Sequence, residues 1–191
     1  TSADILNGLS EWLNMSGAPD IVLFSSPGGN DILNGGDGDD TLDGQSGVDI
    51  LRGGAGDDTY IVTNTGDTVT ENTSEGTDLI WSSVTFTASS DVENLYLYGS
   101  SNINATGNTL DNNLVGNSGN NTLEGESGDD ILRGGAGDDT LNGGDGTDTV
   151  LFSAAANQVD LRITVSQNTG DGNDILTSIE HVTAGGGNDI V

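Results

Sequence analysis

Residues 35–61 read GGDGDDTLD GQSGVDILR GGAGDDTYI, which is three consecutive segments of nine residues. Glycine opens each segment and also stands fourth, aspartate stands sixth, and a large apolar residue stands eighth (Leu42, Leu51 and Tyr60). Residues 125–151 repeat the pattern as GESGDDILR GGAGDDTLN GGDGTDTVL. A fixed period that is kept in two blocks of the chain indicates a repeat architecture.

Each segment divides into a turn and a very short strand. The first six residues are turn residues, because glycine allows tight turns and brings backbone carbonyls close together. The last three, such as Thr41, Leu42 and Asp43, alternate in character and can form only a short strand. One segment is therefore half a coil, and two segments return the chain to its starting side. Position six should then lie beside position six of the segment eighteen residues later, which pairs Asp31 with Asp49, Asp40 with Asp58, Asp49 with Asp67, Asn121 with Asp139, and Asp130 with Asp148.

Stacking of this kind brings the aspartate carboxylates close together, because neighbouring strands lie about 4.8 Å apart. Bare carboxylates at such a spacing repel one another and raise each other's pKa. A hard cation between them turns the repulsion into attraction, and a site made of carboxylates and turn carbonyls suits calcium better than magnesium. The alternative is that glycine and aspartate are ordinary turn residues. Turn chemistry alone, however, does not require aspartate at every sixth position and an apolar residue two places later.

These segments resemble the RTX, or hemolysin-type calcium-binding, repeat, with the pattern GGxGxDx, an apolar residue and any residue. The resemblance is close over residues 26–70 and 116–151 and looser over most of the rest. It implies an all-β fold, a right-handed parallel β-roll or β-helix solenoid with a calcium ion in each turn. We expect wider, metal-free rungs of the same solenoid where the glycine-rich turns stop, after Trp81.

The resemblance also implies which atoms bind calcium, namely the sixth-position aspartates and the backbone carbonyls of the glycine-rich turns. The metal-binding positions predicted in this way are Asp31, Gly35, Gly36, Asp37, Gly38, Asp39, Asp40, Gly44, Gly47, Asp49, Gly53, Gly54, Gly56, Asp57, Asp58, Asp67, Asn121, Gly125, Gly128, Asp130, Gly134, Gly135, Gly137, Asp138, Asp139, Gly143, Gly144, Asp145, Asp148, Asp174 and Asp189. Asparagine replaces aspartate at Asn112 and Asn121, so ions should bind more weakly there. Gln45 and Glu126 replace the second glycine of their segments.

The composition supports a fold that depends on metal. The 191 residues carry a formal charge of −28, with three arginines and no lysine, and only 4% of them are aromatic. Such a chain repels itself and has little apolar surface, so we expect it to be disordered without calcium. Roughly six to ten calcium ions would cancel about half of the charge or more. The charge also excludes nucleic acid as a partner, and no apolar run approaches membrane-spanning length.

The pattern divides the chain into five parts. Residues 1–25 hold a partial repeat and an insertion that caps one end, residues 26–80 and 116–151 are the two calcium-binding blocks, residues 81–115 are metal-free rungs, and residues 152–191 hold an insertion and resumed repeats. In the metal-free rungs we predict strands over residues 83–87 and 94–98, with Val84, Phe86, Leu95 and Leu97 in the core. Both ends of the sequence lie within the pattern. We therefore expect a piece of a longer protein, or a solenoid that meets its neighbours end to end.

Enzymatic activity is not expected in this piece, and any catalytic domain would lie outside it. A glycosidase-like pair of carboxylates could be drawn at many places, but calcium ligation explains the acidic residues better. His181 is the only histidine, the chain has no cysteine, and the glycine-rich turns lack the lysine of a phosphate-binding loop.

Three functions remain open at the level of sequence. The first is a module of a secreted bacterial protein that folds on calcium after export; the resemblance implies an extracellular or cell-surface location and the type I secretion machinery as a partner. The second is a calcium-rigidified spacer in a surface adhesin, surface layer or filament, with end-to-end self-association or contact with the rest of a larger chain. The third is a polysaccharide- or ice-binding face. The threonine rank for that face (Thr41, Thr59, Thr122 and Thr140) is interrupted by Ile50 and Ile131.

Overall fold

Stacked β-strands make up the whole of the described fold. A computed structural model of the chain describes residues 12–14, 22–25, 28–153 and 158–185, and all of its regular elements in these ranges are strands. None of the described residues belongs to a helix that could cross a membrane. Contacts divide the chain into two compact units, with the boundary between Val84 and Thr85. The fold is an all-β solenoid of parallel coils, as the repeat pattern predicts.

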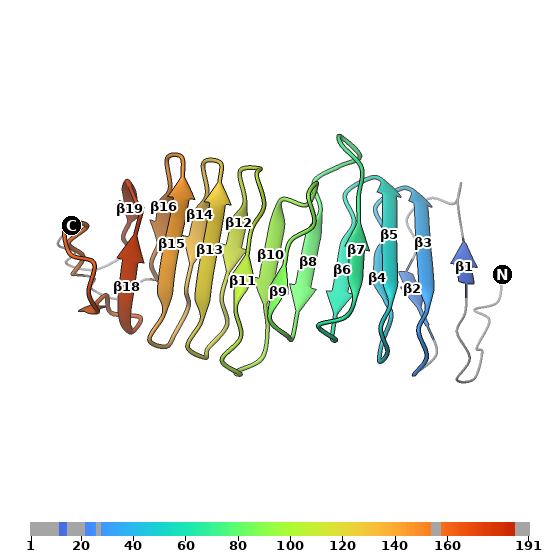
Figure 1. The fold of residues 1–191 in the computed structure, drawn as a ribbon, viewed down its shortest axis with the longest axis horizontal. Helices are drawn as coiled ribbons and strands as arrows, with labels where there is room; N and C mark the ends of the chain where they lie inside the picture. Colours follow the sequence, from blue (N-terminus) through green and yellow to red (C-terminus); the bar gives the residue numbers. More distant parts are fainter. Residues whose placement is uncertain (1–11, 15–21, 26–27, 154–157, 186–191) are drawn as a thin grey trace. The chain divides into compact units, whose positions relative to one another are not determined.

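The first unit consists of two parallel sheets whose strands alternate along the chain (Figure 1). Each coil contributes one strand to each sheet, which is the arrangement expected of two nine-residue segments per coil. One sheet has the order β1 (Trp12–Asn14), β3 (Ile32–Asp37), β5 (Ile50–Ala55) and β7 (Thr68–Thr70). The strands of the other sheet in this unit are β2 (Val22–Phe24), β4 (Thr41–Asp43), β6 (Thr59–Val62) and β8 (Leu79–Ser82).

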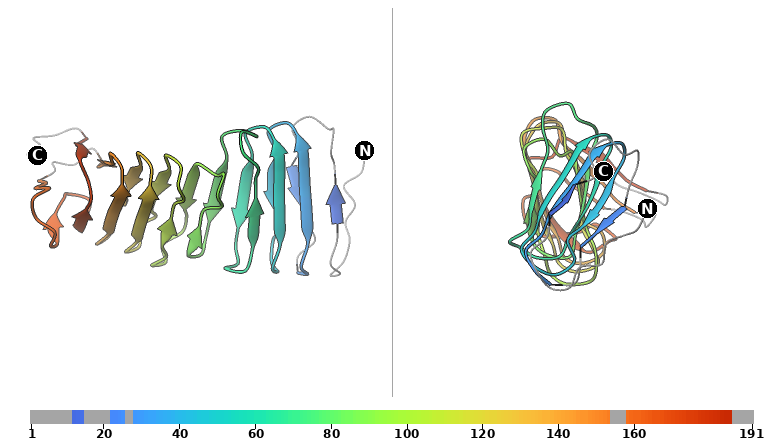
Figure 2. Two further views of the ribbon diagram at one scale, coloured as in Figure 1. Left: turned by 45° about the horizontal axis from the view of Figure 1, so that its top comes forward. Right: turned by 90° about the vertical axis from the view of Figure 1, so that its right-hand side faces the viewer.

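The second unit repeats this alternation, and Figure 2 shows its strands stacked coil upon coil. One set of neighbouring strands is β10 (Asn94–Leu97), β12 (Asn113–Val115), β14 (Ile131–Arg133), β16 (Thr149–Leu151) and β19 (His181–Thr183). The other sheet has the order β9 (Phe86–Thr87), β11 (Ala105–Thr106), β13 (Thr122–Ser127), β15 (Thr140–Asp145), β18 (Asn173–Thr177) and β17 (Gln167–Asn168). Only the β17–β18 pair among these is antiparallel.

A column of apolar side chains forms the core of each sheet. The eighth residue of each segment points inward, and pairing in steps of eighteen residues places it on the equivalent residue of the next coil. The columns in the first unit are Leu33, Leu51 and Val69 on one sheet, and Leu42, Tyr60 and Ile80 on the other. The columns in the second unit include Leu95, Leu114, Leu132 and Val150, and Leu123, Leu141 and Leu176. The eighth position of the segments thus builds the core.

Several coils are longer than eighteen residues, and two of them contain the insertions described next. Tyr60 pairs with Ile80, because a loop over residues 71–76 adds two residues. Leu141 pairs with Leu176, since the excursion over residues 152–172 lies between them. In both places the strand register resumes afterwards, so the insertions leave the stacking of the buried columns intact.

The strand predicted over residues 83–87 is shorter in the structure, where β9 contains only Phe86 and Thr87. The Ser82 hydroxyl donates to the Val84 carbonyl (2.7 Å) and accepts from the Val84 amide (3.2 Å), which bends the chain directly after β8. Val84 and Phe86 are consequently only half-buried, and their predicted place in the core is wrong. Leu95 and Leu97 are buried as predicted.

Truncation of a column residue should destabilise the folded protein far more than truncation of its neighbour. Leu132 is fully buried and Ile131, beside it in β14, is 40% exposed. We expect Leu132→Ala to lower the free energy of unfolding by about 3 kcal/mol or more, through lost apolar contact and the cavity left behind. Urea unfolding in saturating calcium measures this, with Ile131→Ala as the matched control. Similar losses for both variants would contradict the core assignment.

Candidate metal-binding turns

One oxygen of each sixth-position carboxylate joins neighbouring coils. Asp49 Oδ1 accepts a hydrogen bond from the Asp31 amide at 2.8 Å, and Asp58 Oδ1 accepts one from the Asp40 amide at 2.7 Å. In the second unit, Asp148 Oδ1 accepts from the Asp130 amide at 2.9 Å. The donor and acceptor residues are eighteen apart in each case, so the pairing of sixth positions predicted from the period is confirmed.

The other oxygen of these carboxylates is buried and lacks a hydrogen-bond donor. This holds for Oδ2 of Asp49, Asp58, Asp130, Asp139 and Asp148. Buried polar atoms are nearly always paired in folded proteins, and a charged atom without a partner is especially costly. A whole row of such atoms points to positively charged partners that are not part of the polypeptide.

The unpartnered oxygens face a space that only glycine leaves open. A side chain on Gly125 would overlap Asp130 Oδ2 and also the carbonyl oxygen of Gly143 in the next coil. Gly143 has the same surroundings, with Asp148 Oδ2 and the Ser178 carbonyl. Carboxylate and carbonyl oxygens therefore converge on one point above the first glycine of the segment. This donor set and the absence of a side chain there fit a calcium ion.

Burial raises the pKa of these aspartates. Loss of hydration is the largest cause; it raises the pKa of Asp58 to about 7 and those of Asp130 and Asp139 to about 6. The hydrogen bond that each carboxylate accepts from a backbone amide lowers its pKa, whereas neighbouring carboxylates raise it further. The pKa values of Asp49, Asp148 and Asp174 are raised for the same leading reason. A bound cation would act in the opposite direction and favour the charged form.

Comparison with known families agrees with this geometry. A family model described as the RTX calcium-binding nonapeptide repeat matches four copies, over residues 28–60, 106–141, 115–150 and 124–158. The chain carries RTX calcium-binding repeats. RTX repeats bind calcium, and the roll that they build is a structural module rather than a catalytic one. No curated protein matches the chain.

The sixth-position residues of the RTX turns are all buried where they are described: Asp31, Asp40, Asp49, Asp58, Asp67, Asn121, Asp130, Asp139, Asp148 and Asp174. The first glycines are buried as well: Gly35, Gly44, Gly53, Gly125, Gly134 and Gly143. Positive φ angles occur at the following predicted glycines of the second and fourth positions: Gly36, Gly38, Gly47, Gly54, Gly56, Gly128, Gly135, Gly137 and Gly144. Asp189 lies outside the described residues.

Predicted ligands next to these positions are solvent-exposed: Asp37, Asp39, Asp57, Asp138 and Asp145. Three of these side chains accept hydrogen bonds from backbone amides of a neighbouring coil. Asp39 Oδ1 accepts from the Asp57 amide (2.9 Å), and Asp57 Oδ1 accepts from the Thr77 amide (2.8 Å). Asp138 Oδ1 accepts from the Asn173 amide in the same way (2.9 Å). Their side chains thus hold the turns by hydrogen bonds at the surface, while their role as ligands stays a prediction.

Two buried sixth-position carboxylates have protein donors on both oxygens. Asp67 accepts from the Asp49 amide through Oδ1 and from the Thr63 and Asn64 amides through Oδ2. Asp174 accepts from the Asp139 amide at 2.8 Å and from the Thr169 hydroxyl. These two positions need a cation less than those with a free oxygen.

The asparagine turns satisfy themselves through amide groups. Asn121 Oδ1 accepts from the Asn117 amide (2.9 Å), and its Nδ2 donates to the Ile103 carbonyl (2.6 Å). Asn112 does the same, with Oδ1 accepting from the Asn108 amide and Nδ2 donating to the Val92 carbonyl. In both turns the side-chain oxygen faces the first glycine, Gly116 or Gly107, while the nitrogen donates to a carbonyl of the preceding coil. The hydrogen bonds of these turns are complete without metal.

Sequence reasoning missed four residues at these sites. Asp78 and Glu180 take the place of the expected carboxylate, as Asp78 Oδ1 accepts from the Asp58 amide (2.9 Å) and Glu180 Oε2 from the Asp148 amide (2.8 Å). Glu71 and Tyr60 are buried side chains beside Asp58. A signal existed for Glu71, because it lies eighteen residues after Gly53 and so stands at a first-glycine position.

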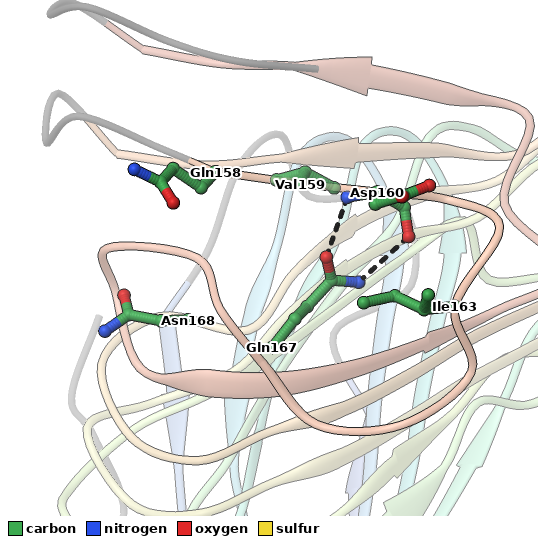
Figure 3. A pocket seen from close by; sticks show the side chains of 6 residues that line it. All are labelled: Gln158, Val159, Asp160, Ile163, Gln167 and Asn168. Carbon is green, nitrogen blue, oxygen red and sulfur yellow. Dashed lines mark hydrogen bonds between the residues drawn. The ribbon is translucent and has the colours of Figure 1, made fainter.

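The excursion after Phe152 encloses a small hollow of a different kind (Figure 3). Its lining residues are Gln158, Val159, Asp160, Ile163, Gln167 and Asn168. The Gln167 side chain bridges it, with Oε1 accepting from the Asp160 amide (2.7 Å) and Nε2 facing the Asp160 carbonyl (3.4 Å). Arg162 pairs with the Asp160 carboxylate at 2.6 Å on the exposed surface. The polar groups here bind one another, which is typical of a structural loop.

Acidification should favour folding when calcium is absent. The pKa values of Asp58, Asp130 and Asp139 are about 6 to 7 in the fold, against an ordinary value of 3.8. Each group therefore stabilises the fold fully below its unfolded pKa and loses this contribution as the pH rises through about 6 to 7. Urea unfolding of metal-stripped protein, measured between pH 4.5 and 8 in an osmolyte that favours the folded state, should show the highest stability at the acidic end. The same series in saturating calcium should have the opposite slope, because calcium requires deprotonated ligands. Metal-free stability that rises with pH would contradict the assignment.

Asn121→Asp should make its turn dependent on metal. The substitution removes the donor to the Ile103 carbonyl and places a carboxylate against carbonyl oxygens. We expect a loss of about 1–3 kcal/mol in calcium-free buffer, measured with an osmolyte that favours the folded state, and recovery of most of it in calcium. Asn120→Asp is the control, because among the contacts described the Asn120 side chain accepts a hydrogen bond from the Asp138 amide and donates none. Equal effects of the two substitutions would show that the Asn121 amide has no special role.

Proposed function

We propose that this chain is a module of a secreted bacterial protein that folds when calcium fills its RTX turns after export. The observation that carries the proposal is the row of buried carboxylate oxygens with no donor, at Asp49, Asp58, Asp130, Asp139 and Asp148. Each of these oxygens borders a space that glycine leaves open, and a further oxygen lines that space at Asp58, Asp130 and Asp148. Calcium is the cation that suits such a space.

Charge explains why binding and folding are coupled. The chain carries a formal charge of −28, and folding without metal brings many of its carboxylates together in buried turns. The unfolded chain does not hold the ligands in place, so the free energy of calcium binding becomes free energy of folding. Sixth-position aspartates and first-glycine carbonyls are the proposed ligands, with roughly six to ten ions in all.

Calcium concentration differs across a cell envelope, so the coupling of folding to calcium binding would let the chain fold on one side only. Inside a cell calcium is scarce, and a self-repelling acidic chain stays unfolded, which suits passage through a narrow export channel. Outside, calcium is plentiful and the chain folds. The family resemblance supports type I secretion as the route and the outside of the cell, or its surface, as the destination.

A stiff spacer in a surface adhesin, surface layer or filament is the second candidate. It is favoured by the turns at Asn112 and Asn121, whose hydrogen bonds are complete without calcium. Coils that are held permanently suit a rod better than a switch. End-to-end association of the folded chain in solution, measured by sedimentation, would favour this candidate; a monomer would favour the first.

Calcium should drive a cooperative transition from coil to β-structure. Circular dichroism of metal-stripped protein, titrated with calcium, should show the transition between about 10⁻⁴ and 10⁻² M, and magnesium should not replace calcium. Asp139→Asn should raise the calcium midpoint, because it removes a buried ligand charge. Asp129→Asn should leave it nearly unchanged, since the exposed Asp129 side chain accepts from the Thr147 amide and an amide oxygen can still accept. An unchanged β spectrum in chelator would overturn the proposal.

A further inference from the structure

Three buried carboxylates meet where the first block of repeats ends. Asp58, Glu71 and Asp78 each offer one oxygen, and these three oxygens lie within 4.8 Å of one another. The residues are only 1%, 7% and 1% exposed. The group lies entirely within the first unit. Like charges this close and this far from water need compensation.

The sequence builds this group by breaking the repeat. Glu71 stands eighteen residues after Gly53, where a turn would begin with glycine, so a carboxylate enters the space that glycine normally leaves open. Glu71 Oε1 accepts from the Gly53 amide at 3.2 Å, and Oε2 is buried without a partner. The coil is two residues longer here, which lets Asp78 reach the Asp58 amide at 2.9 Å.

The Tyr60 hydroxyl is a second observation, independent of the carboxylates, that points to a bound ligand. Tyr60 is completely buried, and its hydroxyl has no hydrogen-bond partner. A side chain on Gly53 would overlap both Asp58 Oδ2 and Tyr60 Oη, so the two oxygens border the same small space. Equivalent positions in the column carry Leu42 and Ile80. A buried tyrosine hydroxyl normally has a partner, so its presence here needs a reason.

We propose that Asp58, Glu71, Asp78 and Tyr60 bind a calcium ion that closes the first repeat block. The ligands differ from those of the repeat, because Glu71 stands at a glycine position and Tyr60 at a core position. Three carboxylate oxygens and a neutral oxygen form a hard donor set, and calcium accepts such crowded protein cages more readily than magnesium does. The inference rests on the proposed function for its choice of cation, but not for its ligands.

The rival explanation is a proton. A neutral Glu71 would relieve the repulsion among the three carboxylates without any metal. It would leave the count of bound calcium ions independent of Glu71, and it would give the Tyr60 hydroxyl no part in calcium binding. The two explanations therefore differ in two measurable quantities.

Native mass spectrometry of the calcium-saturated chain counts the ions directly. We expect Glu71→Gln, which keeps an acceptor for the Gly53 amide, to hold one ion fewer than the parent chain. Glu75→Gln is the matched control, because Glu75 lies in the same loop and its carboxylate accepts only from Asn72 among the contacts described. It should hold the full number. Equal counts in the parent and both variants would overturn the inference.

Tyr60→Phe tests the site without removing any charge. We expect the fold to persist, as leucine and isoleucine occupy the same column, and one ion to dissociate at about tenfold higher free calcium. An unchanged calcium titration, with equal or greater stability after removal of an unpaired hydroxyl, would overturn the inference. This variant also decides the question if Glu71→Gln does not fold.

The counts separate this inference from the proposed function. If the parent binds several ions and Glu71→Gln binds as many, only the site at the end of the block is wrong. If the parent binds no calcium at millimolar concentration, both proposals fail. Magnesium in place of calcium is the third arm, and full occupancy with magnesium would reject calcium as the preferred ion.

Discussion

The structure depends on a carboxylate whose two oxygens have different tasks. One oxygen accepts an amide from the neighbouring coil and fixes the register, as Asp58 does for Asp40. The other is directed into the turn, above a glycine, where the polypeptide offers it no donor. The remaining features of the repeat serve this geometry. The first glycine leaves the space open, and the apolar residue two places after the aspartate holds the strand against the core.

The same carboxylates set the balance between folded and unfolded chain. Most strands whose side chains are described contribute one or two buried apolar side chains, which is a small core for a chain of this length. Burial of bare carboxylates opposes that core, since desolvation raises the pKa of Asp58 and Asp130 above the ordinary value. A divalent cation changes the sign of the interaction at every turn that it fills. We therefore expect the stability of this fold to follow calcium activity more closely than it follows packing.

Much of this was accessible from the sequence, because a period of nine leaves little freedom. It fixes the eighteen-residue register, the apolar column at Leu33, Leu51 and Val69, and the burial of the sixth-position aspartates. Where the period fails, prediction fails too. The bend after β8 comes from a local hydrogen bond of Ser82, and no repeated sequence pattern indicates it. The different roles of Oδ1 and Oδ2 can be seen only in the structure, because the sequence does not distinguish the two oxygens of an aspartate.

Asparagine and aspartate solve the same turn with different chemistry. The Asn121 amide supplies both a donor and an acceptor, so the turn completes its hydrogen bonds from within the chain. Aspartate supplies acceptors only, and its turn has an unmet demand for positive charge. Both asparagine turns lie in the second unit, whereas the first unit has aspartates at its sixth positions and the carboxylate group at Glu71. Calcium dependence is thus distributed unevenly along the chain, and it is the choice between two nearly isosteric side chains that distributes it.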